Sequence, residues 1–166
     1  STQFAPTASY FIRRKVLENL PDWFSSAPIG DLFLEILSLR RGYGLYLPER
    51  MSVYRVFSSG SWSNEMRNSP ERSIDYSHRM LALVSILEAD QFIIVNGLDA
   101  LRANLQVLIA CGSLLCKDFE MFRDYIERAF VLKSHSHSKT AKILYAIRRF
   151  PAFAAWAYRI KCDFFT

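Results

Sequence analysis

The sequence predicts a small α/β part followed by a mainly α-helical region, and three features of the chain support this fold class. Residues 45–47 form a short apolar segment that Pro48 stops, and residues 51–57 alternate apolar and polar side chains as a sheet strand does. An apolar helical pattern precedes both segments, and longer helical patterns follow between residues 71 and 132. The 166-residue chain is 51% hydrophobic and 22% charged, which is typical of a globular protein.

The N-terminal elements lead into a helix that is expected to begin at Asp31. Small, polar and Pro residues fill positions 2–9, so Thr7 lies where the backbone can approach a ligand closely or form an ordinary capped turn. A short helix is predicted over 13–20, and the Pro and Gly residues within 21–30 then disfavour regular structure. A carboxylate at the start of the next helix accepts hydrogen bonds from free backbone N–H groups, which is its ordinary structural role.

Two tryptophans lie in segments that we expect to be loops, Trp23 just before the Asp31 helix and Trp62 in the polar stretch 58–64. An indole can offer its apolar face to a sugar ring, although anchoring a loop by burial is its commoner role. Trp23 is the stronger candidate for a ligand contact because Asp31 is close in the sequence. Arg55, in the second predicted strand, could donate to a phosphate or form a structural ion pair.

The middle of the chain is predicted to form a scaffold of helices over 71–90, 98–117 and 118–132. The links between them are short, which favours antiparallel packing. His78 is expected to be a surface or hydrogen-bonded residue of the first helix. His135 and His137 lie in a Ser-rich segment without supporting Cys or carboxylate ligands, so we expect a polar linker there and no metal site.

The excess of positive charge lies in the C-terminal tail, because residues 1–131 carry 14 Lys/Arg and 15 Asp/Glu whereas residues 132–166 carry seven and one. Pro151 is expected to divide this tail into two short helices. An apolar stripe recurs there at helical spacing through Ile143, Ile147, Phe150, Ala154 and Ala157, with Trp156 and Tyr158 suited to a headgroup boundary. The tail therefore either lies on an anionic membrane surface or packs its stripe on the preceding helices. Nucleic-acid binding is not favoured, since no reading motif accompanies the cations.

Three cysteines, an odd number in apolar helical contexts, indicate reduced, buried thiols of a cytoplasmic protein: Cys111, Cys116 and Cys162. No secretory signal is visible, and the charge-free run 103–116 is shorter than the roughly 20 residues of a membrane-spanning helix. We therefore expect a cytoplasmic protein that is soluble or lies at the inner face of the membrane.

A series of short motifs occupies residues 4–63, namely residues 4–14, the Leu-Pro-Asp-Trp-Phe of 20–24, Gly30-Asp31, the Gly-Tyr-Gly of 42–44 and the Met-Ser-Val-Tyr-Arg-Val of 51–56. In order and spacing this series resembles the acceptor half of a family 2 glycosyltransferase. The resemblance implies that residues 1–66 are the acceptor-side fragment of a GT-A-type fold, followed by the helical scaffold over 67–133 and the basic tail over 134–166.

The same resemblance implies an enzyme that moves a sugar, with inversion, from a nucleotide-sugar to the hydroxyl of a sugar or lipid-linked acceptor in the synthesis of a bacterial surface polysaccharide. In that family the residue matching Asp31 is the general base that takes the proton of the attacking hydroxyl. A carboxylate suits this task because it is ionised at neutral pH and accepts a proton as the oxygen becomes acidic in the transition state. The segment of Thr7 runs under donor and acceptor in the family.

This chain departs from the family in what it lacks. No two of its aspartates are two residues apart, and no Gly-rich loop follows a strand, so the nucleotide-binding region with its Asp-x-Asp is missing. We expect a divalent metal, Mg or Mn, only together with that half and none bound by this chain alone, which should be incomplete and inactive. Phe57 stands where the family commonly has a histidine, which puts a metal or phosphate contact there in doubt. The competing hypothesis is a non-catalytic helical interaction module or membrane-surface module.

Overall fold

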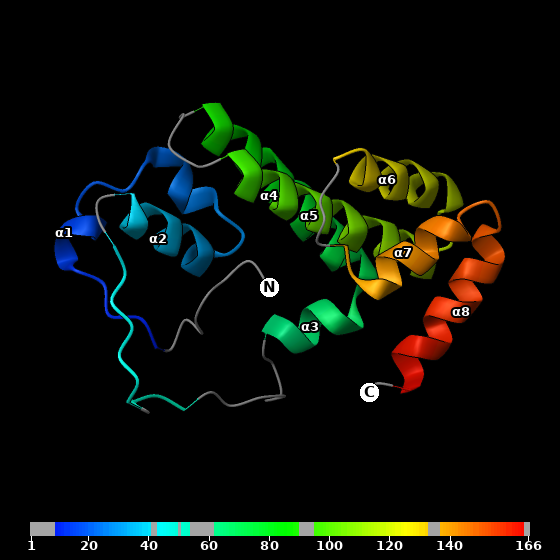
Figure 1. Cartoon of the computed structure of the whole chain (residues 1–166), viewed down its shortest axis with the longest axis horizontal. Coiled ribbons are helices and arrows are strands. Elements are labelled where there is room, and N and C mark those ends of the chain that lie inside the picture. Colours follow the sequence, from blue (N-terminus) through cyan, green and yellow to red (C-terminus); the bar gives the residue numbers. More distant parts are fainter. Residues whose placement is uncertain are drawn as a thin grey trace. The chain divides into compact units, whose positions relative to one another are not determined.

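The computed structural model of this chain describes residues 9–40, 43–49, 51–53, 62–89, 95–132 and 137–164 (Figure 1). The chain divides into two compact units, Ser1–Ser59 and Gly60–Thr166. The boundaries predicted near residues 66 and 133 stay a prediction.

The described part of the first unit consists of short helical elements joined by extended links. They are α1 (Arg14–Leu17), the 3-10 helix η2 (Asp22–Ser26) and α2 (Gly30–Leu39). Helix α2 begins directly after Ile29, which is extended, and it buries Leu32 and Phe33 on one side. The apolar spacing that predicted a helix here therefore marks its buried face.

The predicted α/β fold class is wrong for the described residues. Neither 43–49 nor 51–53 contains a strand, while residues 54–57 of the second predicted strand lie outside the described ranges. Leu45 is 79% exposed and Val53 is 94% exposed, so neither side chain is covered by a neighbouring layer. A strand forms only when a second strand satisfies its backbone N–H and C=O groups, and an alternating sequence does not supply that partner.

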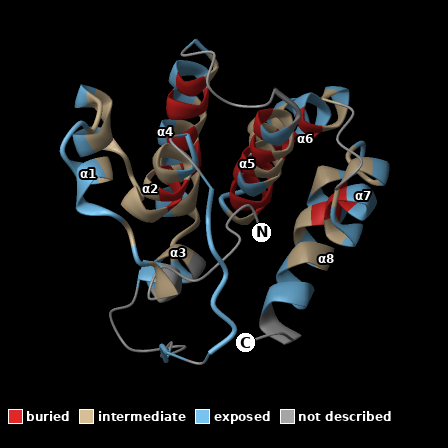
Figure 2. Ribbon diagram, turned by 60° about the vertical axis from the view of Figure 1, so that its left-hand side comes forward, coloured by how far each residue is buried: buried red, intermediate tan, exposed pale blue. Residues whose placement is uncertain are grey.

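The second unit is a helical assembly with α5 at its centre. Its elements are α3 (Trp62–Asn68), α4 (Pro70–Ala89), α5 (Val95–Leu115), α6 (Phe119–Val131), α7 (Lys139–Ala146) and α8 (Pro151–Phe164). Helix α5 contacts α4, α6 and α8, and the buried faces of α4 and α5 are coloured red in Figure 2. The three scaffold helices predicted from the sequence are confirmed, and so is the division of the tail at Pro151.

Local sequence sets the helix ends in this unit. Lys117 takes a left-handed conformation with φ of 61°, which turns the chain between α5 and α6. The Asp118 side chain then accepts a hydrogen bond from Met121 N at 3.0 Å and caps α6. Ser138 caps α7 in the same way by accepting from Ala141 N. The short α5–α6 link expected from the sequence is therefore a tight, capped turn.

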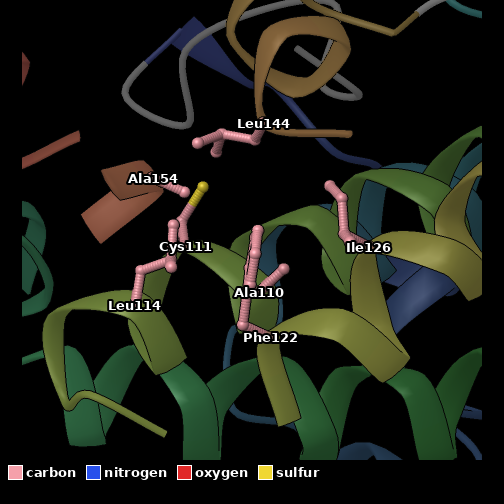
Figure 3. Packing of buried hydrophobic residues seen from close by; sticks show 7 residues of the cluster. All are labelled: Ala110, Cys111, Leu114, Phe122, Ile126, Leu144 and Ala154. Atoms are coloured by element: carbon pink, nitrogen blue, oxygen red, sulfur yellow. The ribbon is translucent and has the colours of Figure 1, made fainter. Parts of the chain in front are cut away.

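The core of the second unit joins α5, α6, α7 and α8. It contains Ala110, Cys111, Leu114, Phe122, Ile126, Leu144 and Ala154. Figure 3 shows the Ala154 side chain directed at Cys111, with Leu144 of α7 above them. Small residues at positions 110 and 154 let the helices approach closely, while Phe122 and Ile126 of α6 fill the remaining space.

Helix α5 contains an apolar stretch, Gly97–Leu115, whose 19 residues and mean hydropathy of 1.3 would be enough to cross a membrane. It begins before the charge-free run noted in the sequence because it includes the charged residues Asp99 and Arg102. More than half of this stretch, 56%, is buried inside the structure, as in the core helix of a water-soluble protein. Length and composition alone are therefore weak support for a membrane span.

An aromatic stack attaches α7 to α6. The Phe130 ring lies parallel to Tyr145, with centroids 4.0 Å apart, and parallel to His137 at 4.1 Å. The Arg148 guanidinium lies 4.0 Å from the Tyr145 ring centroid and donates to Glu127 Oε1 at 2.9 Å. Burial, and then the nearby Lys142, lower the pKa of His137. This ring is part of the packing that holds the tail on the scaffold.

The cysteines differ in their surroundings: Cys111 is buried, whereas Cys116 and Cys162 are exposed, which corrects the expectation that all three are buried. Burial beside Tyr158 of α8 raises the pKa of the Cys111 thiol to about 11. A thiol that is covered and protonated at neutral pH does not react readily, because the thiolate is the nucleophile.

Alkylation of the native protein with iodoacetamide at neutral pH should therefore label Cys116 and Cys162 and spare Cys111. Mass spectrometry of proteolytic fragments identifies the modified residues, and labelling in denaturant serves as the control in which all three react. Labelling of Cys111 as fast as that of Cys162 in the folded chain would contradict the packing of α8 on α5.

Candidate functional site

Asp31 lies in the first turn of α2, where the structure places it half-buried at the start of an apolar helix. Its Oδ1 accepts a hydrogen bond from Leu32 N at 2.8 Å. The helix begins one residue earlier than predicted, at Gly30, and Ile29 occupies the N-cap position without a side-chain cap. Asp31 is therefore a first-turn acid, favoured by the positive end of the helix dipole, rather than the capping residue.

The residues next to Asp31 hold it in place. Leu32 and Phe33 are both buried, and Phe33 has no exposed surface at all. Burial of these two residues fixes how α2 packs in the first unit, and with it the backbone position of Asp31. A catalytic base needs such a fixed position, since its proton transfer depends on hydrogen-bond distance.

Trp23 lies in η2 and packs on the same helix. Its ring meets Phe33 edge-on, with centroids 5.4 Å apart and planes at 73°. This contact is the anchoring role that the sequence left as the alternative for Trp23. The side chain is only half-buried, so part of the indole also faces outward in the first unit.

Glu35 is a second carboxylate of α2 that sequence reasoning missed. It lies one turn after Asp31, is 8% exposed, and accepts a hydrogen bond from the Tyr10 hydroxyl at 2.7 Å. Residues four apart share a helix face, so α2 presents two carboxylates on one side. The sequence signal for it was a single acidic residue within the apolar run of residues 32–37.

The other predicted site residues lie in the second unit or outside the described residues. Trp62 opens α3 in the second unit, is 45% exposed, and meets Tyr76 edge-on with centroids 5.1 Å apart. The predicted loop is wrong from residue 62 onward, because Trp62 already belongs to a helix that precedes α4. Thr7 and Arg55 lie outside the described residues.

The described residues do not fit a divalent metal, because no group of three or more His, Cys, Asp or Glu among them could hold one. His78 is half-buried, and its Nδ1 lies 3.4 Å from the Tyr125 hydroxyl, so its ring has a hydrogen-bond partner as expected from the sequence. His137 stacks on Phe130, and His135 lies outside the described ranges. Of the catalytic chemistry expected from the sequence, the described residues provide the Asp31 carboxylate.

Comparisons of this chain with protein-family models, with curated proteins and with solved structures find no match. Function must therefore be inferred from the motifs and from the geometry around α2.

Proposed function

We propose that this chain is the acceptor-side part of an inverting family 2 glycosyltransferase, in which Asp31 is the general base. The observation that carries the proposal is the position of the Asp31 carboxylate, half-buried in the first turn of α2 and followed directly by buried residues. The ordered motifs of residues 4–63 support the same function. The proposal concerns residues and chemistry, and it does not require a sheet in the described part of the chain.

In the proposed reaction the acceptor hydroxyl attacks the anomeric carbon of the nucleotide-sugar. Asp31 takes the hydroxyl proton as the new C–O bond forms, and the nucleoside diphosphate leaves with the electrons of the broken bond. Attack from the side opposite the leaving group inverts the anomeric configuration. Trp23, packed on Phe33, is the candidate apolar surface for the acceptor sugar ring.

We expect donor recognition to come from residues of the larger protein, because no Asp-x-Asp occurs in this sequence. Diphosphate binding needs a metal or a cluster of donors, and the described residues hold no group of metal ligands. A larger protein containing this chain should release nucleoside diphosphate only when nucleotide-sugar, metal and a sugar acceptor are all present. Donor turnover by that protein that no hydroxyl acceptor accelerates would sink the transferase proposal.

For the isolated chain we expect neither tight binding nor turnover of a nucleotide-sugar. Titration calorimetry with a uridine diphosphate sugar and Mg or Mn tests this, since a missing diphosphate site leaves little to bind. Micromolar, metal-dependent binding would show that the donor site lies within these 166 residues.

The competing class is a non-catalytic helical module, which is favoured by the helical character of the described residues and by the apolar outer surface of α8. The two classes differ in what should precede residue 1 in the whole protein. Strands, crossover helices and an Asp-x-Asp upstream favour the transferase, and an unrelated upstream region favours the module.

A further inference from the structure

Helix α8 has large apolar side chains on the side that faces away from the core. Phe153 is 54% exposed and Trp156 is 60% exposed, and Ile160 continues the same face one turn later. These residues are three and four positions apart, so they form one stripe on the helix, here called the outward face. Ala154 lies on the opposite side, is fully buried, and points at Cys111 (Figure 3).

The outward face corrects the stripe that the sequence predicted. Ala154 belongs to the core, and Tyr158, which was expected at a headgroup boundary, is partly buried against the same core. Two residues of the predicted stripe, Ile143 of α7 and Phe150 in the α7–α8 turn, are exposed. The packing alternative is confirmed for the face that contains Ala154, whereas the membrane-surface alternative stays a prediction.

Several exposed cations belong to α7, to α8 and to the turn between them. Arg149 directly precedes Phe150 and Arg159 precedes Ile160, and both arginines are exposed. Lys139 and Lys142 of α7 are exposed as well, and no described carboxylate forms an ion pair with any of these four side chains. Arg148 and Lys161, by contrast, are used within the fold, since they donate to Glu127 and Thr140.

We propose that the outward face of α8 is a docking surface for an anionic lipid bilayer. A helix on the surface of a soluble protein usually buries its apolar side and exposes a polar one. Helix α8 buries Ala154 in the core and also exposes the apolar outward face. Phe, Trp and Ile enter the boundary between headgroups and acyl chains, while flanking Arg and Lys bind the lipid phosphates. The cation surplus of residues 132–166, in a chain that is otherwise near neutral, provides the charge complementarity for this partner.

The proposal does not depend on the transferase function, since it uses none of the residues of α2. It gives the tail the role of attaching the protein to a membrane surface, which an assay of sugar transfer does not measure. Loss of binding would leave the Asp31 hypothesis untouched, and loss of transfer would leave the docking surface untouched.

Co-sedimentation of the whole chain with vesicles tests the proposal. We expect binding to phosphatidylcholine vesicles that contain phosphatidylglycerol, little binding to phosphatidylcholine alone, and release on addition of sodium chloride. The double variant Phe153→Ser with Trp156→Ser should lower the binding constant by about 10-fold or more, because the apolar insertion is lost. Arg149→Gln with Arg159→Gln should lower it by about 5-fold for each cation.

Matched controls come from α6, which has exposed residues of the same kinds. Val131 is 77% exposed and Arg123 is also exposed, so Val131→Ser and Arg123→Gln remove an apolar group and a cation away from α8. Both controls should bind vesicles as the original chain does. Circular dichroism melting of each variant shows whether a loss of binding reflects unfolding, and the Gln variants leave the core untouched.

Three results would overturn the proposal. They are equal binding to neutral and anionic vesicles, equal losses in the α6 controls and the α8 variants, and an absence of binding by the folded chain. Analytical ultracentrifugation adds a further check, because a dimer that dissociates in the Trp156→Ser variant would assign the outward face to a second copy of this chain instead of a bilayer.

Discussion

If the proposed transferase function holds, an Asp31→Asn variant of the whole protein should transfer sugar about 10²-fold more slowly, or worse, while folding normally. The amide cannot take the proton of the acceptor hydroxyl, so the loss should appear in the rate of transfer at saturating substrates. The Asn side chain keeps an oxygen that can accept from Leu32 N, and Asn is itself favoured near helix starts. The melting temperature should therefore change little.

Glu35→Gln is the matched control, since Glu35 is the second carboxylate on the same side of α2. Its oxygen is occupied by the Tyr10 hydroxyl, so the amide should cost stability more than transfer. Coupled assay of nucleoside diphosphate release measures both variants. Near-normal turnover by folded Asp31→Asn, or a larger loss in Glu35→Gln than in Asp31→Asn, would remove Asp31 as the base.

The scaffold helices could be predicted because each buries its apolar side within the same chain. The pattern expected over 71–90 became α4 at Pro70–Ala89, and that expected over 118–132 became α6 at Phe119–Val131. Apolar residues that recur every 3.6 positions mark the side of a helix that packs on its neighbours. For α4 and α6 this neighbour is α5. The short α5–α6 link was also expected from the sequence, whereas the Asp118 cap is seen in the structure.

The two strands were predicted wrongly for the described residues. An alternating pattern shows that a segment could form a strand, but it does not show whether a second strand is present to pair with it. Residues 51–53 alternate as a strand would, yet the exposed Val53 has nothing beside it. Trp62 was misplaced for a related reason, since polar residues around it masked the start of α3.

The sequence placed Ala154 on one apolar stripe with Ile143 and Phe150, and it left open whether this stripe packs on the scaffold or lies on a membrane. The core face is formed by Ala154, whose small side chain allows close helix contact, while the larger Phe153 and Trp156 face outward. In the first unit, the Pro and Gly residues before Asp31 indicated that a helix begins near it. The burial of Glu35 and its hydrogen bond with Tyr10 are seen in the fold and were not predicted from the sequence.

The Phe122→Ala variant should show the largest stability loss among single changes in the second unit. Phe122 has no exposed surface and packs with Ala110, Cys111 and Leu114 of α5, so its removal leaves a cavity at the α5–α6 contact. Truncation of a buried Phe costs about 3–5 kcal/mol of unfolding free energy, which is a large part of the stability of a small domain.

Phe153→Ala removes the same atoms from a side chain that is mostly exposed, and we expect its unfolding free energy to stay within about 0.5 kcal/mol of the original. Urea unfolding followed by far-ultraviolet circular dichroism compares the two variants through their midpoints, provided that the slopes agree. The contrast separates burial from residue type, because only Phe122 fills the core that joins α5 and α6. Equal losses in the two variants would mean that Phe153 is covered in solution, whereas a negligible loss in Phe122→Ala would show that the α5–α6 core does not stabilise the unit.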